Sequence, residues 1–147
     1  MTNKLLSLIN NENRASIAVE TGNAMHALLQ KVFYPCNDGC DTEILKKISK
    51  TPELCEYMGK LSKTEVPIAG FVNGVFISRR IDRLYVNPQT KKVVVLDYKT
   101  DINRELYFKK YTEQLREYHD LLKQVYPDFN IQCKILWTHD FTLENVI

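Results

Sequence analysis

The sequence predicts an α/β domain in which a mixed central β-sheet is flanked by helices. Apolar residues recur at helical spacing before residue 33 and again over residues 105–125. Between these segments they follow strand patterns, which include four consecutive apolar residues from Val93 to Leu96. Helices, then adjoining strands, then a helix and a last strand are typical of an α/β domain. The 147 residues are enough for a single domain of this kind, expected to span 1–147.

Three helices are expected before the strands, over residues 16–33, 42–49 and 52–61. In the first helix, four apolar side chains fall on one stripe: Met25, Leu28, Leu29 and Val32. The turn-forming sequence from Pro35 to Gly39 ends that helix. In the third helix, Pro52 suits the first turn, and Thr51 is expected to cap it.

Strands are expected over residues 65–68 and 70–77, continuing through 75–86, and again over 92–97. Residues 87–90 form the turn before the apolar run, which suits a central strand covered on both faces. A long helix over 105–125 follows this strand. The alternation of apolar residues after it predicts a last strand over 131–137 with one buried face.

Composition argues against two classes of protein. Twenty Lys and Arg against eighteen Asp and Glu give a net charge of +2, so binding of nucleic acid by bulk charge is not expected, while a local basic patch stays open. The chain has no run of 18 apolar residues, which a membrane-spanning helix needs. Its first residues lack the apolar core and cleavage site of a signal peptide, so a cytoplasmic location without a membrane partner is expected.

The four cysteines carry little functional signal: Cys36, Cys40, Cys55 and Cys133. Without a secretion signal they are expected to stay reduced rather than to form disulfides. Cys36 and Cys40 are a close pair, but a zinc or iron–sulfur site needs a second one. Buried or loop thiols are therefore the expectation, with no iron–sulfur cluster.

Charged residues gather at the end of the apolar strand. Asp97 and Lys99 are two residues apart, so they point to the same face of a strand. A hairpin that pairs Val86 with Val93 places Asp82 opposite Asp97, within about 5.5 Å. Two carboxylates at that distance need a cation between them, and a hard divalent cation binds such oxygens. Lys99 is then placed to orient a water or to stabilise charge on a phosphate.

The same residues also allow a structural interpretation. Asp97 and Lys99 would form an ion pair at the end of the strand, and Asp82 would pair with Arg80 or Arg83 on the surface. An Asp-x-Lys sequence alone does not decide between the two interpretations, and both stay open.

Two further pairs of residues have the spacing of one helical turn. Gly22 precedes His26 and would let the first helix approach the sheet closely, with His26 either a ligand or a structural residue at the border of the apolar stripe. Gln114 and Tyr118 share one face of the long helix. An amide and a phenol suit a sugar-phosphate chain and a base, although the pair also fits a plain helix boundary.

Together and in order, these residues resemble a known family. Five short motifs follow one another: Gly22-x3-His26, Glu65-x-Pro67, Ile81-Asp82-Arg83-Leu84, Val95-Leu96-Asp97-Tyr98-Lys99-Thr100-Asp101 and Tyr111-x2-Gln114-x3-Tyr118. They resemble the PD-(D/E)XK nuclease domain at the C-terminus of the AddA and RecB helicase-nucleases, most closely that of AddA. The resemblance covers about residues 15–140. Each motif is weak singly, but five in this order are specific, and they imply a restriction-endonuclease-like core.

The resemblance implies a role for each matching residue. The metal ligands would be three side chains and one main-chain carbonyl, those of His26, Asp82, Asp97 and Tyr98. Lys99 matches the catalytic lysine. The residues expected to contact DNA are Thr100, Gln114 and Tyr118. Glu65 matches a family glutamate near the site, and a structural role as a partner for a helix dipole or a base stays open.

The implied activity is hydrolysis of DNA phosphodiester bonds with Mg²⁺ or Mn²⁺ as the cofactor. Single-stranded or unwound linear DNA is the expected substrate, in DNA repair, recombination or processing. The chain has no phosphate-binding Gly-rich loop, so a separately encoded helicase is a further expected partner. The tyrosines and basic residues over 104–118 would form either a stacking surface for the strand or a solvated helix face.

The sequence also departs from the family at one point and leaves two other functions open. Ser78-Arg79-Arg80 stands where family members commonly have Gly. The chain would then be either a catalytically silent DNA-binding or assembly module derived from a helicase-nuclease, or a free-standing structure-specific endonuclease. The intact set of polar positions favours an enzyme over the silent module.

Overall fold

The structure of the protein is a computed structural model, which describes residues 22–36 and 39–147. Its elements follow in the order α2 (Thr42–Ser49), α3 (Pro52–Tyr57), β1 (Ser62–Val72), β2 (Val75–Asn87), β3 (Lys92–Lys99), α4 (Arg104–Val125), β4 (Asn130–Trp137) and β5 (Thr142–Asn145). Residues 22–29 form a further helix before α2. The helix predicted over 16–33 therefore ends earlier than expected, and its part over 16–21 lies outside the described residues.

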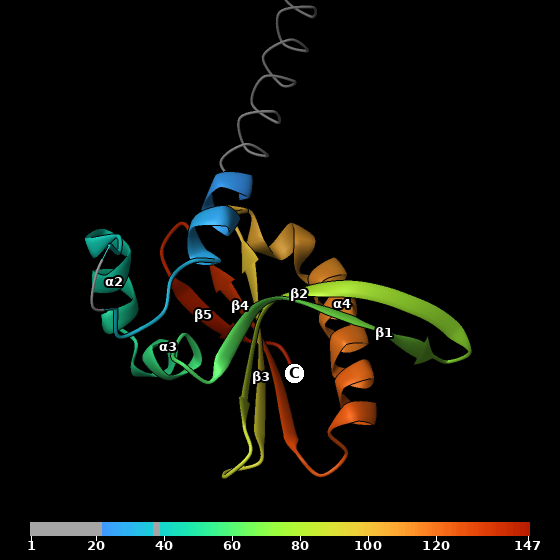
Figure 1. Ribbon diagram of the computed structural model, residues 1–147. Helices are drawn as coiled ribbons and strands as arrows, with labels where there is room; N and C mark the ends of the chain where they lie inside the picture. Colours follow the sequence, from blue (N-terminus) through green and yellow to red (C-terminus); the bar gives the residue numbers. More distant parts are fainter. Residues whose placement is uncertain (1–21, 37–38) are drawn as a thin grey trace, which may run out of the picture.

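The strands form one mixed sheet in the order β1-β2-β3-β4-β5 (Figure 1). Neighbouring strands are antiparallel except β3 and β4, which are parallel and are joined by α4. The predicted pairing of Val86 with Val93 is confirmed. The predicted α/β class with a mixed sheet flanked by helices is also confirmed, while β5 is an additional strand that the sequence pattern does not predict.

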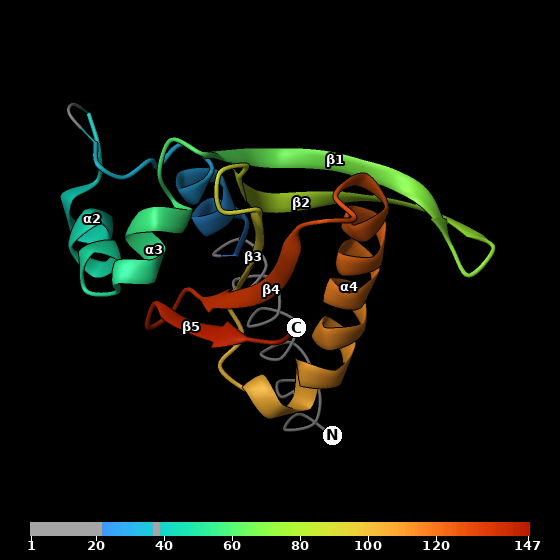
Figure 2. The ribbon, with the colours of Figure 1, turned by 90° about the horizontal axis from the view of Figure 1, so that it is seen from below.

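Helices cover both faces of the sheet (Figure 2). On one face, α4 packs over β3 and β4 around Leu115 and Trp137. On the other face, helix 22–29, α2 and α3 pack over the same strands. Successive residues of β3 enter the two cores in alternation, and Val93 to Leu96 are fully buried. The prediction of a central strand covered on both faces is therefore confirmed.

Of the two short helices, one has its predicted bounds and the other is shorter than predicted. α2 has the predicted bounds. α3 begins at Pro52 as expected but ends at Tyr57, because the chain turns into β1 at Ser62. Thr51 occupies the predicted N-cap position, but its side chain makes no hydrogen bond to the helix. Among the helices of the described residues, none is long and apolar enough to cross a membrane.

β1 and β2 form a long hairpin whose outer part extends past α4 (Figures 1 and 2). Its turn consists of Asn73 and Gly74, with φ angles of 50° and 78°. An Asn-Gly pair with both φ angles positive is typical of a two-residue hairpin turn. The strand predicted over 70–77 is therefore wrong, because this turn divides it. Residues 66–81, the outer part of the hairpin, are called the arm below.

The pairing of β2 is interrupted where the arm meets the rest of the sheet. The β1–β2 ladder is regular on either side but omits Glu65 and Asp82. Glu65 has a φ of 52°, a left-handed conformation that is rare for a residue within a strand. The β2–β3 ladder ends with the pair Arg83 and Leu96, one residue short of Asp82. Asp82 thus lies where β2 separates from β3, and it is the side chain of Asp82 that bonds to the backbone of β3.

One cysteine prediction needs correction. Cys36 and Cys40 form a disulfide, with Cα atoms 6.3 Å apart. The prediction of reduced thiols is therefore wrong for this pair. Cys55 and Cys133 are free thiols, and Cys133 is buried.

Candidate active site

His26 on helix 22–29 is held against Asp82 of β2. His26 Nε2 lies 3.3 Å from Asp82 Oδ2, and His26 Nδ1 lies 2.8 Å from the carbonyl oxygen of Gly22. A carbonyl only accepts, so Nδ1 carries a proton and Nε2 is the ring atom directed at the carboxylate. The hydrogen bond with Asp82 outweighs burial and raises the pKa of His26 to about 9. Without a metal, His26 is therefore an imidazolium paired with Asp82 at neutral pH.

Gly22 allows this helix to approach the end of β3. A Cβ atom at residue 22 would lie 3.3 Å from Thr100 Oγ1, closer than ordinary van der Waals contact. The expected close approach is confirmed, and Thr100 lies beside the helix that carries His26. The DNA contact predicted for Thr100 stays a prediction.

Asp82 reaches from β2 to the backbone of β3. Its Oδ2 atom accepts a hydrogen bond from the backbone N–H of Tyr98 at 2.8 Å. The alternative pairing of Asp82 with Arg80 is not present, because Arg80 Nη1 lies 3.8 Å from Glu65 Oε2. Asp82 is thereby fixed between His26 and the backbone of β3, and Glu65 lies beside an exposed arginine of the arm.

Arg83 is fully buried and points to the end of helix 22–29. Its Nη2 atom donates to the carbonyl oxygens of Leu29 and Val32 at 2.9 and 2.6 Å, and its Nε atom donates to the hydroxyl of Tyr98 at 2.8 Å. A cation at these carbonyls complements the helix dipole and fixes the helix that carries the histidine. The alternative of a surface ion pair with an aspartate is wrong. Sequence reasoning missed this role because spacing does not show which of several arginines is buried.

Asp97 is buried next to Lys99, with 3% of its surface exposed. Lys99 Nζ lies 2.9 Å from Asp97 Oδ2, an ion-pair distance, but the angles are not those of a hydrogen bond. Within residues 22–36 and 39–147, this Oδ2 is the only buried side-chain nitrogen or oxygen without a hydrogen bond. Burial raises the pKa of Asp97, the charge of Lys99 opposes this, and the charge of Asp82 adds to it. The ammonium group of Lys99 is the cation that offsets the burial of this oxygen, and a metal ion would have to take over that contact.

Lys99 extends from β3 to α4, where it meets residues predicted for the site. Lys99 Nζ donates to Gln114 Oε1 at 3.1 Å, and Gln114 Nε2 donates to the hydroxyl of Tyr118 at 2.9 Å. Lys99 Nζ also lies 4.2 Å from the centre of the Tyr111 ring, a cation–π contact. The structure therefore brings three predicted residues together. Tyr118 is only 2% exposed, so the interpretation of its ring as a stacking surface is wrong.

A cavity of about 520 Å³ lies between β2, the end of β3 and α4. Its lining consists of Arg79, Lys99, Lys110, Tyr111, Glu113, Gln114 and Glu117. Arg79 Nε lies 3.1 Å from Glu117 Oε2, and Lys99 pairs with Asp97, so Lys110 is the lining cation outside these two ion pairs. The ammonium group of Lys99 thus borders the cavity, whereas His26, Asp82 and Asp97 are not among its lining residues.

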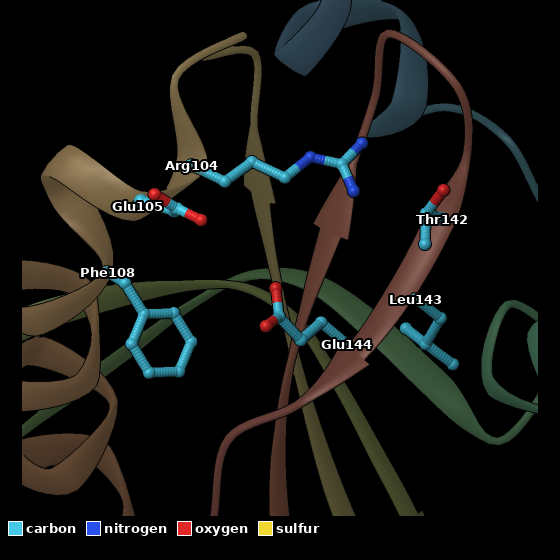
Figure 3. Close-up of a pocket in the computed structure, with 6 residues that line it drawn as sticks. All are labelled: Arg104, Glu105, Phe108, Thr142, Leu143 and Glu144. Atoms are coloured by element: carbon cyan, nitrogen blue, oxygen red, sulfur yellow. The ribbon is translucent and has the colours of Figure 1, made fainter.

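Another cavity, of about 620 Å³, opens between α4 and β5 (Figure 3). Its lining consists of Arg104, Glu105 and Phe108 from α4 and Thr142, Leu143 and Glu144 from β5. None of the predicted site residues lines this cavity. Arg104 Nη2 lies 2.6 Å from Asp140 Oδ2, so its charge is already paired. We therefore place the candidate site at the other cavity, beside Lys99.

The side chains predicted as ligands are of the types that a hard divalent cation binds. The imidazole of His26 contacts the carboxylate of Asp82, and the charge of Asp82 acts on the buried carboxylate of Asp97. In the described part of the chain, no three His, Cys, Asp or Glu side chains are already arranged as a metal site. The proton on His26 and the ammonium group of Lys99 pair with the two carboxylates instead.

Two comparisons with known proteins were without a match. The chain matches no model of a known protein family, and a search of curated proteins finds no match either. The fold establishes the class, an α/β domain with a five-stranded mixed sheet, and the site geometry is the basis for a functional proposal.

Proposed function

We propose that the protein is a metal-dependent nuclease with a restriction-endonuclease-like PD-(D/E)XK core, and that it hydrolyses DNA phosphodiester bonds. The observation that carries this proposal is the buried Oδ2 atom of Asp97, which accepts no hydrogen bond and lies 2.9 Å from Lys99 at the wall of a cavity. The resemblance of the five ordered motifs supports it. So does the contact of Lys99 with Gln114, which that resemblance places in one site.

Four groups would hold Mg²⁺ or Mn²⁺: the side chains of His26, Asp82 and Asp97 and the carbonyl of Tyr98. The hydrogen bond from His26 Nδ1 to Gly22 orients Nε2 for this role, as a backbone carbonyl does for many metal-binding histidines. A bound cation supplies a water of lowered pKa and polarises the scissile phosphate. His26 must give up its extra proton before it binds, because only the neutral imidazole is a ligand.

Lys99 would stabilise the charge that develops on the phosphate. Its ammonium group is held between Gln114 Oε1 and the Tyr111 ring, so it is aimed before the substrate arrives. Lys110 lines the same cavity and would attract the neighbouring phosphates of the chain. Single-stranded or unwound linear DNA is the proposed substrate, supplied by a separately encoded helicase.

A second candidate function is a DNA-binding or assembly module without catalysis. The observation that favours it is the mutual pairing of the charged groups, His26 with Asp82 and Lys99 with Asp97. These pairs neutralise the site without a cation. The module would bind DNA equally well in EDTA and in Mg²⁺, and it would leave the DNA intact.

The test is incubation of the purified protein with end-labelled linear single- and double-stranded DNA in Mg²⁺, Mn²⁺ or EDTA. We expect the wild type to cut in Mg²⁺ or Mn²⁺ and not in EDTA. Lys99→Ala and Asp97→Ala should abolish cutting. Lys46→Ala, which changes an exposed lysine on α2, is the matched control and should cut like the wild type.

Two results would contradict the proposal. Equal cutting by the wild type and Lys99→Ala would remove Lys99 from the reaction. Binding of DNA without cutting in any metal would establish the module instead. A circular substrate in the same assay separates the free-standing endonuclease, which cuts it, from an enzyme that requires DNA ends.

A further inference from the structure

The arm has one covered face and one exposed face. Ile77 on the covered face is 8% exposed, and a Cβ atom at Gly70 would lie 3.0 Å from Leu121 of α4. The residues that alternate with these are all exposed: Pro67, Ala69, Phe71, Phe76, Ser78 and Arg80. Because strand residues alternate between faces, these side chains form one continuous outer surface of the arm.

Two aromatic rings dominate the far end of this outer surface. Phe71 and Phe76 are a cross-strand pair, and they are 63% and 60% exposed. Their ring centres are 5.5 Å apart in an edge-to-face arrangement. Two exposed phenylalanine rings in contact form a small contiguous apolar surface, a feature that binding surfaces share.

The outer surface carries an exposed cation and leads to the candidate site. Arg80 is the charged residue among these exposed side chains; its Nη1 atom lies 3.8 Å from Glu65 Oε2, and 68% of its side chain stays exposed. The next residue along β2 on this alternation is Asp82, a proposed metal ligand. Asp82 lies six positions beyond Phe76 along the strand, which corresponds to about 20 Å. A single strand of nucleic acid carries flat bases and charged phosphates at regular intervals. Its bases match the two rings, and a phosphate matches the cation.

We propose that the outer surface of the arm binds a single-stranded segment of nucleic acid, with bases stacked on Phe71 and Phe76 and a phosphate bound by Arg80. This inference rests on the proposed function, because it makes the arm the guide for the strand that enters the site. Bases in a duplex present only their edges, so exposed rings of this kind stack on unpaired bases. The nuclease would therefore prefer strands long enough to reach from the site to the end of the arm.

The experiment measures binding in EDTA, where no cutting occurs. A dye-labelled oligothymidylate of about 12 nucleotides is titrated with protein, and fluorescence anisotropy gives the dissociation constant. We expect the double variant Phe71→Ala/Phe76→Ala to bind about tenfold more weakly or worse than the wild type. The matched control is Leu106→Ala/Val125→Ala, which removes two apolar side chains that are 67% and 61% exposed on α4. It should bind like the wild type.

A second variant makes stacking visible directly. Phe76→Trp places an indole on the arm, and the oligonucleotide should quench its fluorescence, whereas the buried Trp137 should be unaffected. Equal affinity of the wild type and the double alanine variant would overturn the proposal, and so would the absence of binding by the wild type. Sedimentation would also overturn the proposal if the wild type were a dimer and the double variant a monomer. The outer surface of the arm would then bind a second copy of the chain.

The outcomes separate this inference from the nuclease proposal. If the phenylalanines are required for binding but the wild type cuts nothing in Mg²⁺ or Mn²⁺, the binding surface stands and the nuclease assignment fails. If the wild type cuts DNA and the double variant binds and cuts equally well, the nuclease assignment stands and the role of the arm fails.

Discussion

Asp97 Oδ2 lies 2.9 Å from Lys99 Nζ, yet this buried oxygen accepts no hydrogen bond. A carboxylate in this position is less stable than in water, and burial accordingly raises the pKa of Asp97. The ammonium group of Lys99 offsets part of this cost, and a divalent cation bound to the carboxylate would offset more of it.

Asp97→Asn should stabilise the protein in the absence of metal. Because the folded pKa of Asp97 is raised, its ionised form destabilises the fold at neutral pH, and this effect disappears as the pH falls below about 4. We expect a gain of about 1 kcal/mol or more at pH 7 in EDTA, measured by urea denaturation. Asp120→Asn, at an exposed carboxylate, is the control and should change little. A loss of stability in Asp97→Asn would show that the ion pair with Lys99 is structural.

His26 should make stability depend on pH in the absence of metal. Its pKa is raised to about 9, so the protonated ring stabilises the fold fully below about pH 6.5, and this contribution is lost as the pH rises through 9. Because 35% of the side chain is exposed, solvent reduces the effect to about 1 kcal/mol. Thermal denaturation in EDTA across this window should show a decline in the wild type that His26→Gln lacks. Parallel profiles of the two proteins would refute the pairing with Asp82.

Arg83→Met should be among the most destabilising single substitutions. It leaves the carbonyl oxygens of Leu29 and Val32 without the buried donor that they share. We expect a loss of about 3 kcal/mol in the free energy of unfolding. Arg79→Met, at an arginine whose side chain is 44% exposed, is the matched control and should lose less than about 0.5 kcal/mol. If Arg83→Met also lost less than about 0.5 kcal/mol, the buried contacts of Arg83 would not hold helix 22–29.

Tyr118→Phe tests whether Tyr118 of α4 positions Lys99 through Gln114 or contacts DNA itself. The variant removes the hydroxyl that accepts from Gln114 Nε2 and keeps the buried ring. If Tyr118 acts through Gln114 on Lys99, kcat falls by about tenfold while KM is unchanged. Tyr126→Phe, beyond the end of α4, should have wild-type kinetics. A rise in KM without a change in kcat would assign the hydroxyl to DNA binding instead.

Much of the fold could be predicted because several helices and one strand pairing depend only on residues close together in the sequence. The range 42–49, the long helix and the pairing of Val86 with Val93 follow from periodicity and from one turn. The hairpin turn at Asn73-Gly74 was missed, although that dipeptide is the strongest short hairpin signal. β5 was missed because it has four residues and is fixed only by its distant partner β4.

The candidate site was predictable where residues share one strand or one helix face. Lys99, Gln114 and Tyr118 meet because α4 crosses the end of β3. The burial of Tyr118 depends on how α4 is rotated against the sheet, which helical spacing does not determine. The burial of Arg83 depends on the distance between helix 22–29 and β2, and no local pattern encodes that distance.

The binding of Mn²⁺ tests the central claim most directly, because it asks whether His26, Asp82 and Asp97 hold one divalent cation. Free Mn²⁺ is measured by electron paramagnetic resonance during titration into the wild type, Asp82→Asn and the control Asp120→Asn. We predict that the wild type and the control bind one Mn²⁺ per chain, and that Asp82→Asn binds it at least about tenfold more weakly. Equal binding by Asp82→Asn, or no binding by the wild type, would contradict the metal site and with it the proposed nuclease.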